Sequence, residues 1–257
     1  MSNGLWTSVK DNVVFVLVCV GIAAALFAIA YLAEKLIKKK NNDTERILST
    51  RKITMIGVFA AISTVLMMFE FPVPFAPAFY ELDFSEIPAL IGTFAFGPVA
   101  GVMIELCKIL LKLLIKGTST AFVGDLANFV IGCSFILPAS IIYMFKKTKK
   151  NAILASVTGT LIMSVFGTLF NAVYLLPAFA SLYGMPLEAI VEMGTKVNGS
   201  INSVTTLVIF AVAPLNLLKG SSVSIVTLLV YKKLSPILKT GTVGRVKNAA
   251  KKVETVR

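Results

Sequence analysis

Two polar side chains near the end of the last long apolar run are placed where they could bind a ligand together. Asn216 and Lys219 follow Pro214, and their spacing puts both side chains on one face of a helix. An amide that donates and accepts hydrogen bonds, beside a cationic donor, suits a heterocycle edge that presents carbonyl and imide groups. Lys219 has a second interpretation, in which it reaches the cytoplasmic interface or pairs with a carboxylate. The sequence leaves both interpretations open.

Asn171, in the preceding apolar run, is a further candidate, because an amide in hydrocarbon must form hydrogen bonds. A contact between helices is the more common role of such a residue, and ligand binding is the alternative. Asn128 and Asp125 in the run before it have the same two interpretations, and Asp125 could also cap a helix near the outer end. We expect each of these side chains to have a partner.

Glu105, Lys108 and Lys112 follow one another at intervals that place them along one face of a helix. This pattern favours a salt bridge inside a helix bundle. We therefore interpret these three residues as structural rather than catalytic.

Other residue types argue against an enzyme or a metal site. The sequence has no His, and its three Cys lie inside apolar runs without a CxxC pair. A zinc site, a His-based catalytic triad and a disulfide framework therefore lack their usual residues. No GxxxxGK[ST] sequence is present to hold ATP phosphates. We predict no catalytic residues, no metal and no cofactor, and an active transporter of this composition would need an ion gradient or a separate ATPase.

The composition indicates an all-α polytopic membrane protein. Of the 257 residues, 56% are hydrophobic and only 15% are charged, and the mean hydropathy is +0.85. Soluble domains are about 45–50% apolar and about 25% charged. Several uncharged apolar runs of about 20 residues match, as helices, the roughly 30 Å hydrocarbon thickness of a lipid bilayer.

The positive charge is concentrated beside the apolar runs. Most of the 25 Lys and Arg lie in three segments, Lys35–Lys52, Lys146–Lys150 and Lys232–Arg257. Under the positive-inside rule these segments face the cytoplasm, which places the N-terminus outside and the C-terminus inside. No aromatic and basic interleaving or RNA-binding motif accompanies the charge, so we predict no nucleic-acid partner.

The apolar runs predict one accessory helix followed by six core helices. Residues 1–52 form an accessory transmembrane helix and a basic cytoplasmic linker, residues 53–239 the six-helix core, and residues 240–257 a basic cytoplasmic tail. The first run, Val13–Ala33, is too long for a cleaved signal peptide and reads as a retained anchor. The second core helix is short, because Gly97-Pro98 ends the apolar stretch that starts at Ile87. A short helix at membrane depth is typical of the wall of a binding cavity.

Gly57 and Ala61 form a small-xxx-small pair on the first core helix. Such residues let another helix approach closely. The pair predicts either a contact within the bundle or a docking face for a partner.

Several stretches together, between Arg51 and Lys239, carry a resemblance to a known family. They are FPVPFAP at 71–77, LDFSEIPALIG at 82–92, FGPVAG at 96–101, Lys108, FN at 170–171 and NLLK at 216–219. In this order and spacing the chain resembles the substrate-binding S components of energy-coupling factor (ECF) vitamin transporters, and among them the riboflavin-specific members. The resemblance does not extend to the accessory helix.

The resemblance implies a six-helix bundle that binds riboflavin, as transported ligand, in a pocket on the outer side. Asn171, Asn216 and Lys219 match family residues that hydrogen-bond the isoalloxazine ring. Residues of the stretch Glu81, Leu82, Asp83 and Phe84 are implied in the pocket and in the loop that caps it.

The resemblance also implies partners and a place in the cell. The family works in prokaryotic cell membranes with a transmembrane coupling protein and two cytoplasmic ABC ATPases, which agrees with the missing P-loop. S components usually dock the coupling protein with two alanines four residues apart, and here Gly57 and Ala61 occupy those positions.

Three alternatives remain open at the sequence level. An S component for FMN or another water-soluble vitamin would share the scaffold, and Lys116 and Lys196 could then meet a phosphate at the outer mouth. A stand-alone secondary transporter or channel predicts paired intramembrane carboxylates, and only Glu105 lies deep in a predicted span. An intramembrane enzyme predicts His, paired Asp or a Ser-Lys arrangement, which the sequence lacks.

Overall fold

The computed structural model describes residues 13–118, 120 and 122–254. Predictions for residues 1–12 and 255–257 lie outside the described residues. The described chain is helical apart from one short hairpin, and its elements are α2 (Val13–Lys40), α3 (Thr50–Met68), β1 (Phe71–Pro72), β2 (Glu81–Leu82), α4 (Glu86–Phe96), α5 (Pro98–Lys116), α6 (Val123–Phe145), α7 (Lys149–Phe170), η1 (Asn171–Leu175), α8 (Leu176–Tyr183), α9 (Leu187–Val197), α10 (Val204–Leu207), η2 (Val208–Val212) and α11 (Ala213–Glu254).

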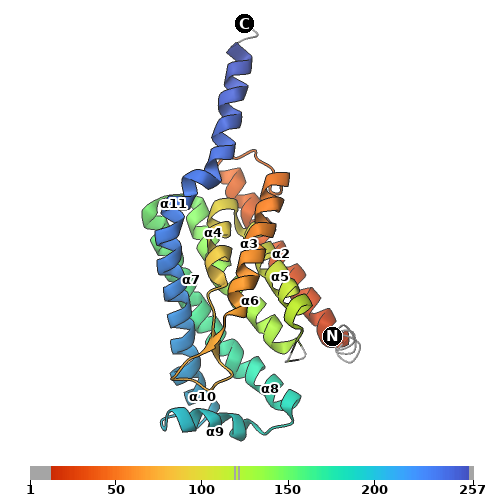
Figure 1. Ribbon diagram of the computed structural model, residues 1–257, viewed down its shortest axis with the longest axis vertical. Coiled ribbons are helices and arrows are strands. Elements are labelled where there is room, and N and C mark those ends of the chain that lie inside the picture. The colour runs from red at the N-terminus through yellow and green to blue at the C-terminus, as the bar shows by residue number, and fades with distance from the viewer. Residues whose placement is uncertain (1–12, 119, 121, 255–257) are drawn as a thin grey trace.

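The long helices form a bundle with α8, α9, α10 and the hairpin at one end (Figure 1). Among the described residues, five helical segments are long and apolar enough to cross a bilayer: Leu17–Lys40, Thr50–Met68, Val123–Phe145, Lys149–Tyr183 and Val204–Leu234. The helix α5 has the length of a span but carries Glu105, Lys108 and Lys112. With α4 and α5, the core therefore has the six predicted segments.

The short helix α4 is enclosed by protein rather than by lipid. It packs against α3, α5, α6 and α11, and nearly all of its residues are buried. Gly97 ends it with a φ of 106°, a conformation that favours glycine, and Pro98 opens α5 at a position where its missing N–H costs nothing. The predicted break at Gly97-Pro98 is confirmed. A helix too short to span can lie at this depth because its ends meet protein groups.

Two π-helical segments interrupt the long helices next to the hairpin end. The segment η1 separates α7 from α8, and η2 separates α10 from α11; the two segments contact each other. Pro177 and Pro214 follow them and cannot continue the regular backbone ladder. Such π segments are frequent at functional sites.

The first helix, α2, packs against α5 and α6. Glu34 on α2 is fully buried, accepts a hydrogen bond from Val99 N at 3.1 Å and lies 3.8 Å from Lys52 Nζ. Just beyond α2, Asn41 Nδ2 donates to the Met144 carbonyl oxygen at 3.2 Å. The boundary at residue 52 between the accessory segment and the core stays a prediction. The contacts of Glu34 and Asn41 show that side chains of the accessory segment pack on the core.

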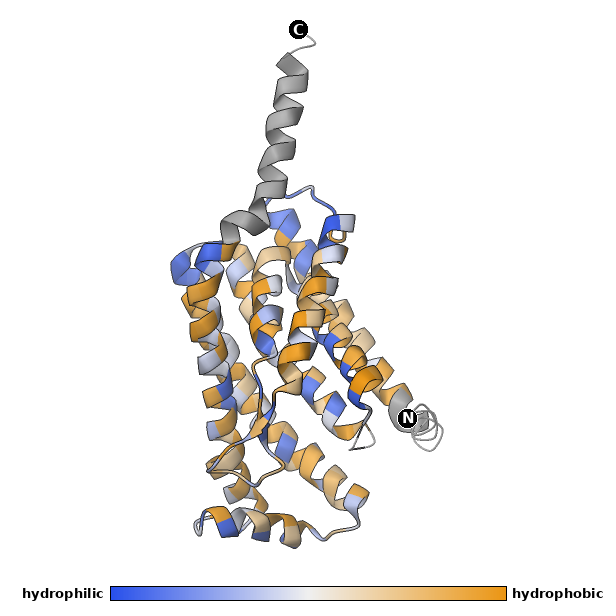
Figure 2. Cartoon of the chain, in the orientation of Figure 1, coloured by the Kyte–Doolittle hydropathy of each residue, from blue (hydrophilic) through white to orange (hydrophobic). Residues whose placement is uncertain are grey.

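The three basic segments lie at the end of the bundle opposite the hairpin (Figure 1), where the contact between Asn41 and Met144 joins the first two. Tyr143 on α6 also donates to the Tyr231 hydroxyl on α11, at 3.4 Å. Figure 2 shows hydrophilic residues gathered at this end and hydrophobic residues along the sides.

Two connecting segments contain more helix than the sequence indicates. The last apolar span ends near Leu234, but α11 continues as helix to Glu254, into the predicted basic tail. Residues 181–200, which the sequence places in a loop between two spans, contain the end of α8 and the amphipathic helix α9. On α9, Ile190 and Gly194 are buried at a spacing of four residues, which gives this short segment one apolar face to pack against the bundle.

Candidate ligand-binding site

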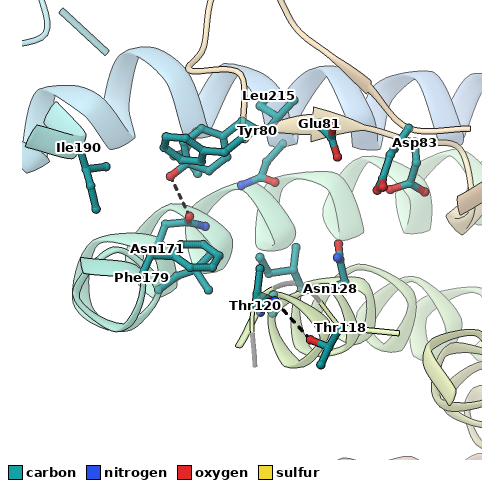
Figure 3. A pocket seen from close by; sticks show the side chains of 18 of the residues that line it. Tyr80, Glu81, Asp83, Thr118, Thr120, Asn128, Asn171, Phe179, Ile190 and Leu215 are labelled. Atoms are coloured by element: carbon teal, nitrogen blue, oxygen red, sulfur yellow. Dashed lines mark hydrogen bonds between the residues drawn. The ribbon is translucent and has the colours of Figure 1, made fainter. Parts of the chain in front are cut away.

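A cavity of about 620 Å³ lies at the hairpin end of the bundle (Figure 3). Its walls come from the connection between α3 and α4, the turn between α5 and α6, and the helical segments α6, η1, α8, α9, η2 and α11. Ile131, Leu175, Phe179 and Leu215 contribute apolar surface. The volume lies within the range of roughly 300–1,000 Å³ that is usual for small-molecule sites.

Five of the seven predicted substrate-binding residues line this one cavity: Glu81, Asp83, Asn171, Asn216 and Lys219. They come from the loop before α4, from η1 and from α11. Residues more than a hundred positions apart in the sequence therefore face the same space.

Leu82 and Phe84 are not among the residues that line the cavity. Leu82 is buried in an apolar cluster, and the Phe84 ring lies 6.1 Å from that of Phe71. In β2 the exposed Glu81 precedes the buried Leu82, because successive side chains of a strand point to opposite faces. Both residues support the loop rather than the cavity wall.

Lys219 pairs with two carboxylates at the buried end of the cavity. Its Nζ lies 2.9 Å from Asp83 Oδ2 and 3.0 Å from Glu86 Oε2. Of the interpretations that the sequence left open, the structure shows the carboxylate pair, and it also places Lys219 in the cavity wall. Burial raises the pKa of the Asp83 carboxyl, but Lys219 and Lys108 outweigh this effect and hold the pKa at about 2.

Glu86 extends this ion pair into the bundle. Its Oε1 lies 3.1 Å from Lys108 Nζ, and Lys108 Nζ lies 2.6 Å from Glu105 Oε2. The predicted structural pair of Glu105 and Lys108 is confirmed, and both side chains are completely buried. The role of Glu86 was not predicted, because in the sequence it follows closely on the acidic residues Glu81 and Asp83 of the same loop. Glu86 is the first residue of α4, where the helix dipole favours a negative charge. This position separates it from the other acidic residues of the loop.

Lys112 does not belong to this chain of charges. Its Nζ lies 2.5 Å from Asp125 Oδ1 in the first turn of α6, and Lys112 lines the cavity. Asp125 therefore has a partner on another helix, as expected for an acidic group at this depth. Asn128, one turn further along α6, also lines the cavity.

Asn171 and Asn216 lie against the same backbone segment of α7. Asn171 Nδ2 donates to the Gly167 carbonyl oxygen at 2.8 Å, and a Cβ on Gly167 would lie 2.6 Å from Asn216 Nδ2. The glycine thus leaves room for the amide of Asn216. Tyr80, a residue that was not predicted, donates to Asn171 Oδ1 at 3.0 Å (Figure 3). No spacing rule in the sequence connects this loop tyrosine to Asn171.

The part of the cavity wall near the turn between α5 and α6 carries a charge pair rather than a lone cation. Lys116 lines the cavity and pairs with Glu70. Burial and the nearby Glu70 raise the pKa of Glu81. Lys196 is not a lining residue and lies 3.7 Å from Glu192 on the same helix. Of the two lysines considered for a phosphate, only Lys116 is at the cavity.

Gly57 and Ala61 lie on the exposed face of α3, away from the cavity. A Cβ added to Gly57 would meet nothing within 4 Å. The opposite face of α3, with Ile56, Phe59 and Ala60, is buried. Within the part of the chain that the structure describes, no group of three His, Cys, Asp or Glu residues is suited to hold a metal ion.

Residues 51–231 match the profile of the family described as ECF transporter, substrate-specific component. The chain belongs to this family. The matched region contains every residue discussed above for the cavity, whereas α2 precedes it.

Several relatives of this S component have names that state a substrate. It is 34% identical over 189 residues to "Riboflavin transporter RibU" of Staphylococcus aureus, covering 74% of this chain and 93% of the relative. It is 30% identical over 190 residues to "Riboflavin transporter FmnP" of Bacillus subtilis, covering 74% and 94%. The relative in Streptococcus thermophilus, also named "Riboflavin transporter RibU", is 31% identical, with coverage of 74% and 85%.

A solved structure of the S component of a bacterial ECF transporter has the same fold. The TM-score is 0.57 and the sequence identity 36%, with coverage of 74% of this chain and 98% of that chain. The predicted fold class, a helical membrane protein with an S-component core, is confirmed.

Proposed function

We propose that this S component binds riboflavin and presents it for uptake by an ECF transporter. The observation that carries the proposal is the convergence of Asn171, Asn216 and Lys219 on one cavity. These residues come from distant parts of the chain, and the names of the curated relatives state riboflavin transport. Riboflavin is then the transported ligand rather than a cofactor.

The cavity suits a flat and uncharged ligand. Apolar side chains such as Phe179 and Leu215 can cover the faces of the isoalloxazine ring, while the polar residues meet its edge. A ligand that leaves a buried polar group unpaired loses roughly 1–3 kcal/mol. This penalty lets the cavity discriminate between uncharged ligands that differ in their hydrogen-bonding groups.

The paired cation at the mouth favours riboflavin over FMN. A phosphate would meet Lys116, but Glu70 already neutralises this lysine, and Glu81 lies close by. A phosphate would have to displace a carboxylate and then approach a second one. We therefore expect FMN to bind more weakly than riboflavin.

The remaining parts of the transporter come from partners. We propose that a transmembrane coupling protein and two cytoplasmic ABC ATPases drive transport, and that Gly57 and Ala61 form the docking face. The chain itself is proposed to have no enzymatic activity. The clustered basic segments support an orientation in a prokaryotic cell membrane with the cavity outside, the N-terminus outside and the C-terminus in the cytoplasm.

Titration of the detergent-purified full chain tests the substrate. We expect one riboflavin per chain, a flavin absorbance spectrum in the bound state, and at least tenfold weaker binding of FMN. Equal affinities for riboflavin and FMN would contradict the role given to Glu70 and Glu81. A chain that binds neither flavin would overturn the proposed substrate and leave only the family assignment.

A further inference from the structure

The direction of the hydrogen bonds around Asn171 follows from its neighbours. Asn171 Nδ2 lies 2.8 Å from the Gly167 carbonyl oxygen, which can only accept. The amide nitrogen therefore faces Gly167, and Oδ1 faces the Tyr80 hydroxyl at 3.0 Å (Figure 3). Because Oδ1 also accepts only, Tyr80 is the donor. Burial raises the pKa of Tyr80, which keeps the proton that it donates.

These two contacts decide what Asn171 can offer to a ligand. Tyr80 occupies its oxygen, and Gly167 takes one of the two Nδ2 hydrogens. The second Nδ2 hydrogen remains, and Asn171 lines the cavity. Asn171 therefore meets a ligand as a hydrogen-bond donor.

Two other polar residues of the cavity wall also supply donors. Asn216 is 6% exposed, and its Nδ2 has no hydrogen-bond partner within the described part of the chain. Lys219 has three N–H donors and no acceptor. Its Nζ donates to Asp83 and forms an ion pair with Glu86, and Lys219 lines the cavity.

We propose that Tyr80 is a positioning residue that holds the Asn171 amide as a donor, so that this part of the cavity wall selects a hydrogen-bond acceptor on the ligand. This inference rests on the proposed function. In riboflavin the matching acceptors are N1, O2, O4 and N5 of the isoalloxazine ring. Tyr80 itself lines the cavity, and the positioning role assigned to its hydroxyl is exerted through Asn171.

The first test compares ligands on the unchanged chain. Riboflavin is titrated beside 1-deazariboflavin, 5-deazariboflavin, 2-thioriboflavin and 4-thioriboflavin, each of which removes or weakens one acceptor. We expect at least one analogue to bind about tenfold more weakly than riboflavin, because a buried donor loses its partner. If all four analogues bind within twofold of riboflavin, the donor assignment is overturned while the proposed function stands.

The second test repeats the series with Tyr80→Phe. Without the hydroxyl, Asn171 Oδ1 loses its partner and the amide is held from one side only. We expect riboflavin to bind about tenfold more weakly to Tyr80→Phe than to the unchanged chain. We also expect a smaller ratio between the affinities for riboflavin and for the analogue that the unchanged chain binds weakly. A purely structural tyrosine would lower the affinity for all ligands by the same factor.

Tyr143→Phe is the matched control. It also removes a buried tyrosine hydroxyl with a hydrogen bond, the bond to Tyr231, but Tyr143 does not line the cavity. We expect its selectivity to equal that of the unchanged chain. If Tyr80→Phe keeps the full selectivity, or if Tyr143→Phe loses as much, the positioning role is overturned.

Asn171→Ala keeps the inference testable if Tyr80→Phe does not fold. It removes the donor that Tyr80 is proposed to hold. The ratio between the affinities for riboflavin and for the weakly bound analogue should therefore fall. Unchanged selectivity in Asn171→Ala would overturn the inference. Failure of the unchanged chain to bind riboflavin would instead overturn the proposed function, and the inference with it.

Discussion

At the scale of single residues, Lys219 joins the cavity to the charged interior of the bundle. It lines the cavity and contacts Asp83 and Glu86, of which Glu86 also contacts Lys108. Removing one partner of a buried ion pair is strongly destabilising, because it leaves the other charge uncompensated. The proposed ligand-binding role of Lys219 must therefore be separated from its structural role by comparison with a second lysine.

Lys219→Ala should weaken both the fold and the binding of riboflavin. We expect a loss of about 3–5 kcal/mol in the free energy of unfolding and a roughly 10- to 100-fold weaker affinity, the effect of losing one hydrogen bond from a charged donor. Thermal unfolding in detergent and riboflavin titration of the folded fraction measure the two effects. Lys108→Met is the control, because Lys108 is in the same charge network but does not line the cavity. An equal loss of affinity in Lys108→Met would contradict the proposed contact between Lys219 and the ligand.

Gly167→Ala should displace the Asn216 amide. The added Cβ would lie 2.6 Å from Asn216 Nδ2, which is closer than a carbon and an amide nitrogen can approach. We expect riboflavin affinity to fall about tenfold, the cost of one misplaced hydrogen bond. Gly57→Ala is the matched control, since it also places alanine inside a helix but meets nothing within 4 Å. Equal affinities of the two variants would argue against the role of Gly167.

The sequence identifies Asn171, Asn216 and Lys219 because a polar group inside an apolar run is costly wherever the helices lie. It does not identify Tyr80 or Glu86. Tyr80 lies in a loop, where a tyrosine carries no such cost, and its contact with Asn171 depends on the path of the chain between β1 and β2. Only the folded structure brings these residues together.

At the scale of helices, α2 is tied to the core by its side chains at the end opposite the cavity. Glu34 accepts a hydrogen bond from Val99 N at the start of α5, where a negative charge is favoured by the helix dipole. Lys40 Nζ lies 4.8 Å from the centre of the Phe145 ring at the end of α6. The helix α2 thus contacts the ends of two core helices.

Glu34→Ala should therefore destabilise the bundle without changing ligand binding. It removes the carboxylate at the start of α5 and the partner of Lys52. We expect a loss of about 1–2 kcal/mol, seen as a lower Tm, and unchanged riboflavin affinity. Glu45→Ala is the control, because Glu45 is exposed in the connection between α2 and α3. A loss of riboflavin binding in Glu34→Ala would mean that α2 controls the cavity from a distance.

The order and number of the core helices follow from the apolar runs and from Gly97-Pro98, which is why the six-segment core was predicted. The helix α9 was missed because eleven residues with charged positions resemble a loop until their one apolar face is recognised. The continuation of α11 was missed because Lys232 and Lys233 mark the end of an apolar run and not the end of a helix. Hydropathy reports the membrane boundary, whereas backbone helicity can continue beyond it.

At the scale of the whole molecule, three features lie in separate places. The cavity is at the hairpin end, the basic segments are at the other end, and the small residues of α3 face outward between neighbouring apolar side chains. Val58 and Ile62 are exposed beside Gly57 and Ala61. A partner can therefore reach this face of α3 without contacting the cavity.

Gly57→Leu should impair assembly with the coupling protein and spare riboflavin binding. The added side chain projects into open space in the isolated chain, so it costs the fold little, but it prevents the close helix approach that small residues permit. Co-purification with the proposed coupling protein and ATPases measures assembly, and riboflavin titration measures binding. Val157→Leu on α7 is the control, since Val157 is also exposed on the side of the bundle. Intact co-purification of Gly57→Leu would exclude this face of α3 as the docking surface, and equal impairment in Val157→Leu would show that added bulk anywhere on the bundle disturbs the complex.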